Sequence, residues 1–317
     1  MRAAGGPVHL LTLGPLTNVA SALRDDPGLV EGLAGITIMG GALDVPGNAL
    51  RNPAAEFNVW VDPVAAEEVI RSGAAITLVP LDATNSAPVT PFFADALARH
   101  HPTPEAGTVY ELFRRQPYLV EGTYYFWDPL SAAILVDPTL ATLEEHRLTV
   151  LEGQKETQGR VVDDPDGAPV EVAVGADALA FETEFLNTLN GDHSVTSTRP
   201  HPVATITFGE TSCSYLGPAS LPAELVGVEM DNPTTEPWSA LLVPIPQGRT
   251  FSDVRALAEG FRPGDEPPTW VKAVGWTTLT PGQRQLAAWT LEPGTYGLVC
   301  AGQAEGTIRA VAEIAAG

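Results

Sequence analysis

The chain has 317 residues, enough for two domains of ordinary size, and 44% of them are hydrophobic, so it can bury a sizeable core. Its 39 acidic residues outnumber the 17 basic ones, giving a formal net charge of −22. This balance argues against nucleic acid and anionic membrane surfaces as partners, because both require a positive face. No apolar run is long enough to span a bilayer, so membrane insertion is not expected.

Short apolar runs alternate with helical patterns through the first 80 residues. Strands are predicted at residues 8–13, 35–39 and 75–80, and helices at residues 17–24 and 62–70. A long loop that follows the second strand carries Asn48 and Glu56. This alternation predicts a parallel sheet with flanking helices, whose ligands bind at the carboxyl ends of the strands. Gly14, Met39 and Asp82 lie at those ends.

The middle of the chain is predicted to be helical from residue 90 to 115, with a break at residues 101–104, and loop-like from 118 to 126. It leads into Trp127-Asp128-Pro129, where a proline in the first turn starts a helix. A carboxylate there is electrostatically favoured and well placed for a cation or polar ligand. Taken alone, the segment is typical of a helix cap beside a buried tryptophan. Two β-rich runs within residues 148–174 and a helix over 176–190 complete this region.

Several short motifs occur in a fixed order. Residues 14–18 read G-P-L-T-N, residues 39–41 read M-G-G, residues 47–48 read G-N, residues 55–58 read A-E-F-N, residues 62–66 read D-P-V-A-A and residues 127–129 read W-D-P. In order and spacing they resemble the motifs of the inosine-uridine preferring nucleoside hydrolase family, over about residues 8–190. The resemblance implies an enzyme that cleaves the N-glycosidic bond of ribonucleosides to ribose and free base.

The resemblance also implies roles for individual residues. In the family, a calcium ion holds the attacking water and two ribose hydroxyls, and the sugar passes through an oxocarbenium-like state. By position, the backbone carbonyl of Leu13 and the carboxylate of Asp128 would be calcium ligands, since both are hard oxygens. The ribose would be held by three hydrogen-bonding side chains and one apolar one: Asn48, Glu56, Asn58 and Met39.

Trp127 stands where other family members have a histidine that protonates the leaving base. The histidines of this chain lie in a strand or far from every motif. Members with tryptophan at this position resemble the purine-preferring group, which stacks the base between aromatic rings. We therefore expect Trp127 to stack the base and favour purines, with Tyr124, Tyr125 or Phe126 as a second aromatic.

The family's first strand carries a D-x-D-x-x-x-D-D segment that supplies most metal ligands and the base for the water. This sequence contains no such segment. One carboxylate and one carbonyl do not make a calcium site of six to eight oxygens, so the site is incomplete and the strand at 8–13 is expected to expose an edge. Two hypotheses follow. The chain belongs to a secreted nucleoside hydrolase whose N-terminal segment lies outside this sequence, or it is a non-catalytic protein that binds a nucleoside or another partner.

The pattern of predicted secondary structure changes after residue 192. We predict a nucleoside hydrolase-like domain over residues 1–192, a linker over 193–203, and a β-sandwich over 204–317 with one helix at 251–260. Strands are expected at residues 204–208, 224–230, 240–244, 285–291, 294–300 and 307–314. The final strands resemble a cupredoxin-like sandwich, but no histidine follows His201, so the copper ligands are missing.

Cys213 and Cys300 are the only cysteines, and both fall in this second domain. We predict a disulfide between its strands; the alternative is a pair of buried free thiols. A disulfide would favour a secreted protein, and free thiols a cytoplasmic one. The expected partners are a small-molecule nucleoside and, where the protein forms a homo-oligomer, a second copy of the chain.

Overall fold

The computed structural model describes residues 6–120, 124–153, 156–191, 202–262, 265–302 and 308–317. The chain divides into two compact units, one containing the chain up to Pro88 and from Tyr125 to Thr188, the other containing Val89–Tyr124 and the C-terminal part. Residues 193–201, most of the linker predicted over 193–203, lie outside the described residues, so the domain limits at 192 and 204 remain predictions. Within the described ranges, no helix is long and apolar enough to cross a membrane.

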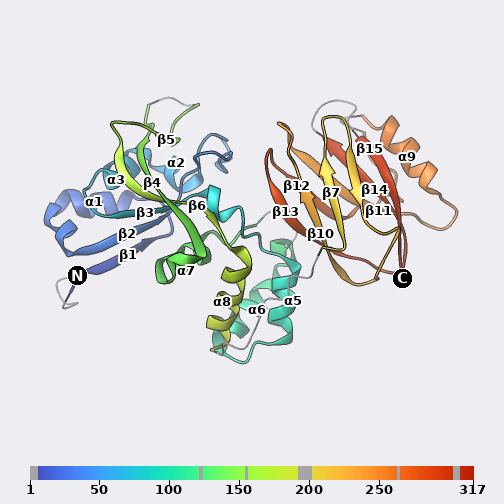
Figure 1. Ribbon diagram of the computed structural model, residues 1–317, viewed down its shortest axis with the longest axis horizontal. Coiled ribbons are helices and arrows are strands. Elements are labelled where there is room, and N and C mark those ends of the chain that lie inside the picture. The colour runs from blue at the N-terminus through green and yellow to red at the C-terminus, as the bar shows by residue number, and fades with distance from the viewer. Residues whose placement is uncertain (1–5, 121–123, 154–155, 192–201, 263–264, 303–307) are drawn as a thin grey trace. The chain divides into compact units, whose positions relative to one another are not determined.

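The first unit is built on a six-stranded sheet. Its strands are β1 (Val8–Thr12), β2 (Leu33–Met39), β3 (Ile76–Val79), β4 (Ala141–Val150), β5 (Val161–Asp163) and β6 (Ala168–Ala176). Their order is β1-β2-β3-β6-β4-β5 (Figure 1). The first four run parallel, whereas β4 runs antiparallel to both its neighbours. The predicted α/β sheet is therefore confirmed, with mixed rather than purely parallel pairing.

Helices cover both faces of this sheet, as the side chains of β2 show. Ile38 joins a buried apolar cluster with residues of α1 (Thr17–Asp25) and α3 (Pro63–Ile70). Side chains alternate along a strand, so Met39 points to the opposite face. On that face α7 (Trp127–Val136) contacts β1 and β2. The carboxyl ends of β1 and β2 therefore lie beside the start of α7.

Strand β1 stands at the end of the strand order in the part of the chain that the structure describes. Leu10 and Leu11 are only partly buried, whereas Ile36, Ile38 and Met39 of β2 are buried. An apolar strand of this kind normally has neighbours on both sides. The structure is thus consistent with the exposed edge expected from the sequence.

The segment before α3 differs from the prediction. A loop was expected up to Asp62, but Phe57–Val61 forms a short helix, α2. The side chain of Glu56 caps it by accepting the backbone N–H groups of Asn58 and Val59. A helix of five residues is too short to show a clear hydrophobic period, so the sequence pattern did not reveal it.

The predicted helical stretch from residue 90 to 115 is confirmed as two helices, α5 (Pro91–Arg99) and α6 (Pro104–Arg115). Each begins with a threonine cap followed by proline: Thr90 accepts the N–H of Phe93, and Thr103 accepts that of Ala106. A 3₁₀ helix, η2 (Pro117–Val120), follows, and residues 121–123 lie outside the described residues.

The described residues from 202 onward form two β-sheets and one helix, α9 (Phe251–Gly260). Its strands are β7 (Ala204–Phe208), β8 (Cys213–Leu216), β9 (Ser220–Leu221), β10 (Leu225–Asp231), β11 (Trp238–Pro244), β12 (Val274–Leu279), β13 (Arg284–Thr290), β14 (Gly294–Gly302) and β15 (Ile308–Ala316). One sheet has the order β13-β10-β7-β8 and the other β12-β11-β14-β15-β9. The six predicted strands and α9 are confirmed, although Thr307 lies outside the described residues, and β8, β9 and β12 were missed.

Buried side chains from both sheets form one apolar core. Phe208, Met230 and Trp289 come from the four-stranded sheet, and Trp238 and Leu298 come from the five-stranded sheet. The rings of Phe208 and Trp238 stack at 5.8 Å between the two sheets. The predicted β-sandwich therefore has the two-layer core that such a fold requires; its likeness to cupredoxins remains a prediction.

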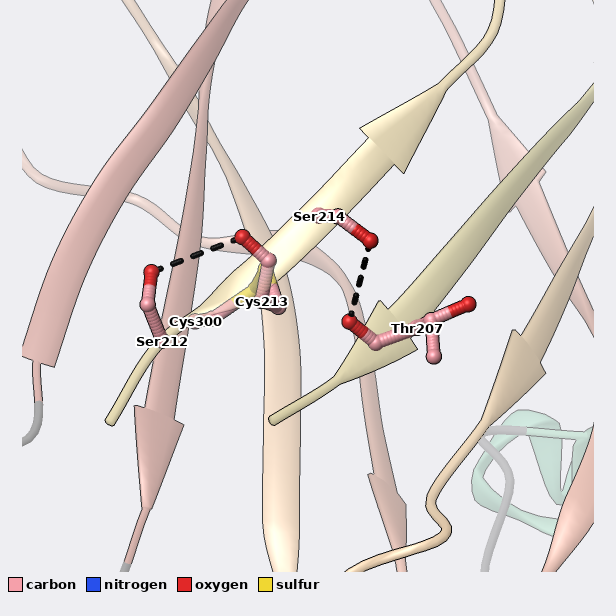
Figure 2. The surroundings of a disulfide bond; sticks show 5 residues. All are labelled: Thr207, Ser212, Cys213, Ser214 and Cys300. Atoms are coloured by element: carbon pink, nitrogen blue, oxygen red, sulfur yellow. Dashed lines mark hydrogen bonds between the residues drawn. A yellow bond between two sulfur atoms is a disulfide. The ribbon is translucent and has the colours of Figure 1, made fainter. Parts of the chain in front are cut away.

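A disulfide joins Cys213 of β8 to Cys300 of β14, which confirms the predicted pair (Figure 2). Because β8 and β14 belong to different sheets, the bond is a covalent link across the sandwich. The two Cα atoms are 6.2 Å apart, and Cys300 is fully buried. The bond closes a loop over a sequence separation of 87 residues, so it restricts the unfolded chain considerably.

We expect denatured, unreduced protein to show no reactive thiols. Replacing both cysteines by serine should lower the free energy of unfolding by about 2–4 kcal/mol, measured by urea denaturation. Wild-type protein treated with a reductant serves as the matched control and should show the same loss. Two reactive thiols in the unreduced protein would contradict the assignment.

Candidate functional site

The candidate site lies at the carboxyl ends of β1 and β2. The strands are parallel and pair Thr12 with Ile38, so Leu13, the residue after β1, lies beside Met39, the last residue of β2. Leu13 is 41% exposed, whereas Met39 is buried. The carboxyl end of a parallel sheet is where such folds bind their ligands. Two predicted site residues are thus brought together by strand register alone.

The carboxylate of Glu56 is the best-buried charged group of the site, with 2% of its surface exposed. Its Oε2 accepts three backbone N–H groups: from Gly41 at 3.1 Å, Asn58 at 2.9 Å and Val59 at 3.2 Å. Gly41 follows β2, whereas the other two donors open α2. One oxygen atom therefore ties the end of the strand to the start of the helix.

Burial and charge act together on the two carboxyl groups of the site. Desolvation raises the pKa of Glu56 above its ordinary value of 4.5, against the lowering effect of its three amide donors. The charge of Asp128 raises that pKa further, so the two carboxyl groups lie close enough to repel each other. Partial burial also raises the pKa of Asp128 from 3.8. Their surroundings therefore favour the protonated form of each carboxyl group, or a neighbouring cation.

Each of the two predicted asparagines uses one side-chain atom in a hydrogen bond within the protein. The Nδ2 of Asn58 donates to the carbonyl oxygen of Met39 at 3.2 Å and lies 3.4 Å from its Sδ. The Oδ1 of Asn48 accepts the N–H of Phe57 at 2.8 Å, and Asn48 itself is exposed. Both residues thus also hold the loop through these hydrogen bonds. Each also keeps a second polar atom beyond these bonds.

Trp127 forms part of a small apolar wall. It packs, with Val45, against a buried cluster of Met39, Ala42 and Leu81. The ring is therefore held beside the residue predicted to lie beneath the sugar. This contact places Trp127 beside Met39; its role in stacking a base stays a prediction.

One of the three aromatic candidates, Tyr125, lies beside Trp127. The Tyr125 ring lies 5.9 Å from that of Trp127, at an interplanar angle of 47°. Phe126 is buried and packs against Phe181 and Phe185 of α8 (Ala178–Asn190). Tyr124 contacts Tyr118. Tyr125 is thus an aromatic neighbour of Trp127.

The oxygen donors do not make a calcium site. Among the described residues, no group of three or more His, Cys, Asp or Glu is arranged to hold a metal ion. The predicted donors are one carbonyl, from Leu13, and one carboxylate, from Asp128, and Glu56 is already engaged by backbone amides. Calcium takes six to eight oxygens. The residues present therefore do not fit a complete metal site.

Sequence reasoning noted Asp82 only as lying at the end of a strand. In the structure its carboxylate accepts two backbone N–H groups of the loop that follows β2, from Leu43 at 2.9 Å and Asp44 at 2.8 Å. Gly47 was seen only as part of a motif. A side chain there would collide with the backbone of Ala55, because an added Cβ would lie 2.0 Å from its carbonyl oxygen. For the role of Asp82 in holding this loop, the only signal in the sequence was its position at the end of a strand.

Comparisons with known proteins agree on one family. A sequence profile described as "Inosine-uridine preferring nucleoside hydrolase" matches residues 1–183. The chain is 36% identical over 171 residues to a pyrimidine-specific ribonucleoside hydrolase, RihA, of Klebsiella pneumoniae (strain 342), covering 52% of this chain and 53% of the relative. It is 34% identical over 182 residues to an inosine-uridine preferring nucleoside hydrolase of Leishmania major, covering 55% and 57%. The chain thus spans about half the length of these relatives.

Solved structures give the same result. The inosine-uridine preferring nucleoside hydrolase from Bacillus anthracis superposes with a TM-score of 0.54 at 27% identity, covering 60% of this chain and 62% of that chain. An inosine-guanosine nucleoside hydrolase superposes with a TM-score of 0.52, also at 27% identity, covering 59% and 62%. The similarity therefore extends from sequence to fold.

The buried carboxyl group of Glu56 should make stability depend on pH. Its pKa is higher in the folded than in the unfolded protein, so its contribution to stability is complete below pH 4.5 and is lost as the pH rises through the raised pKa. Glu56→Gln keeps the acceptor oxygen and removes the titration. We expect the variant to gain stability relative to wild type between pH 4 and pH 8, measured by urea denaturation. A difference that stays constant across this range would contradict the assignment.

Proposed function

Because the chain belongs to the inosine-uridine preferring nucleoside hydrolase family, we propose that the carboxyl end of its sheet binds a ribonucleoside and serves hydrolysis of the N-glycosidic bond. The observation that carries the proposal is the linked set of Met39, Glu56 and Asn58 beside Trp127. Polar groups for a sugar and an aromatic surface for a base meet there on adjacent elements.

The hydrogen bonds within the protein suggest which atoms hold the ribose. All three amides that bond Glu56 donate to Oε2, so we assign its Oε1 to a ribose hydroxyl. Asn58 uses its Nδ2 on Met39, which assigns its Oδ1 to accept from a hydroxyl. Asn48 uses its Oδ1 on Phe57, which assigns its Nδ2 to donate. Each side chain is thereby oriented by one bond and binds the sugar through its other atom.

For the base, we propose that Trp127 is the stacking surface and Tyr125 its neighbour. A purine presents a larger ring face than a pyrimidine, so stacking on Trp127 favours purines. The relatives include pyrimidine-specific, non-specific and inosine–guanosine enzymes, so preference varies within the family. In this chain we attribute the proposed preference for purines to Trp127.

Calcium is the metal that we propose for a complete site of this family, with Leu13 and Asp128 among its ligands. The described residues do not supply the remaining oxygens. We therefore derive no step of the cleavage through the ion. What this chain's own residues provide is binding and orientation of the nucleoside.

We propose an extracytoplasmic location on the basis of the Cys213–Cys300 disulfide. Disulfides persist in oxidising compartments, whereas cytosolic thiols are kept reduced.

The second candidate function is nucleoside binding without catalysis. The observation in its favour is the short set of metal-binding oxygens among the described residues. Both functions predict binding, and only hydrolysis predicts turnover. We expect these 317 residues to show little or no turnover of inosine in the presence of calcium, measured by release of hypoxanthine. Robust turnover would contradict this expectation and remove the non-catalytic alternative.

Binding itself can be tested with a matched pair of tryptophan variants. Trp127→Ala should weaken inosine binding by about 1–3 kcal/mol, the usual value for one base stacked on an aromatic ring, and should weaken uridine binding less. Isothermal titration calorimetry measures both affinities. Trp276→Ala is the control, because Trp276 is 60% exposed on β12, a strand of the C-terminal sandwich. Equal losses for inosine and uridine would count against the purine preference, and inosine binding unaffected by Trp127→Ala would count against the site.

A further inference from the structure

The short helix α4 (Leu81–Thr84) holds the loop that follows β2 by a carboxylate clamp. Asp82 is its second residue, and its two oxygens accept two consecutive backbone amides of that loop. Oδ2 accepts the N–H of Leu43 at 2.9 Å, and Oδ1 accepts the N–H of Asp44 at 2.8 Å. Hydrogen bonds from amides to an ionised group are stronger than neutral ones. One side chain thus fixes two successive peptide units.

Backbone hydrogen bonds extend the same attachment. Gly40 donates to the carbonyl oxygen of Val79 at 3.3 Å, and Leu81 donates to that of Gly41 at 2.9 Å. Gly41 has a φ of +88°, a conformation that glycine adopts without strain, and this turns the chain toward α4. Beyond Gly41, where strand pairing has ended, the carboxylate of Asp82 keeps the loop attached to α4.

The clamped loop carries one side of the candidate site. Ala42 precedes the clamped amides and Val45 follows them, and both belong to the apolar wall around Trp127 and Met39. Further along, the loop presents Asn48. A loop released from Asp82 would therefore move Ala42 and Val45 away from Trp127 and shift Asn48.

We propose that Asp82 is a positioning residue of the nucleoside site: it clamps the loop that follows β2 and so sets the distance between that loop and Trp127. The inference rests on the proposed function, because it assumes that this wall binds a nucleoside. Asp82 acts through the backbone of Leu43 and Asp44 and makes no contact with the ligand itself.

The test compares three variants of the full chain with a matched control. Asp82→Ala removes both acceptors. Asp82→Asn keeps one acceptor oxygen and places an amide donor against the other N–H, and Asp82→Glu keeps the carboxylate on a longer side chain. The control is Asp177→Ala, because Asp177 likewise accepts two backbone amides, from Leu179 and Ala180, at the start of α8.

Two readouts are needed. Hydrogen exchange measured by mass spectrometry should show faster exchange in peptides covering residues 42–48 for Asp82→Ala, a smaller effect for Asp82→Asn, and none for Asp177→Ala. Titration with inosine should show affinity lowered by about tenfold or more in Asp82→Ala and partly restored in Asp82→Glu, a loss that fits removal of two charge-assisted hydrogen bonds. Asp177→Ala should bind inosine as wild type does.

The outcomes separate the two proposals. If wild type binds no inosine, the proposed function fails, and hydrogen exchange still tests the clamp. Unchanged exchange at residues 42–48 in Asp82→Ala would overturn the clamp whatever the affinity. Faster exchange with unchanged inosine affinity would also overturn the inference, since the loop would then be held without consequence for the ligand. Equal losses of affinity in Asp82→Ala and Asp177→Ala would reduce Asp82 to a general stabilising residue.

Discussion

The buried carboxylate of Glu56 is the interaction on which the site depends. A charged oxygen with almost no solvent must find its partners within the protein, and it finds three backbone amides. Those amides come from the turn after β2 and from the first turn of α2, so the end of a strand and the start of a helix share one acceptor. Losing the carboxylate would leave three amide donors without it, which costs more than a single surface hydrogen bond.

Hydrogen bonds from side chains also join other sequence motifs to one another in the folded protein. Thr17 donates its hydroxyl to Asp62 at 2.5 Å, so the G-P-L-T-N and D-P segments meet although they lie 45 residues apart. Asp62 also caps α3 through the N–H of Ala65. Asn48 similarly reaches Phe57 across the loop. The motifs therefore describe a framework as well as a set of ligand contacts, and a residue can serve both.

The parts of the fold that the sequence predicted are those with a local physical signal. Apolar runs mark the strands, and Thr90 and Thr103, each followed by proline, mark helix starts. β8, β9 and β12 were missed because two are very short and the third exposes Trp276 on its outer face. Motif resemblance indicated Glu56 and Trp127. The hydrogen bonds from the loop to Asp82 were not predicted, because a side chain that bonds to backbone amides 38 and 39 residues away leaves no pattern in residue types.

The link between Cys213 and Cys300 also determines how the C-terminal sandwich would come apart when its chain is cut. The bond encloses β9 to β13 and α9 within one covalent loop, whereas β7 and β15 lie outside it. A single cleavage inside the loop leaves both pieces joined, and a cleavage before β8 or after β14 releases a fragment. Limited proteolysis of this protein would thus depend on reductant only for cuts between the two cysteines. After such a cut the pieces stay joined without reductant and separate with it, whereas a cut outside this loop gives the same fragments in both conditions.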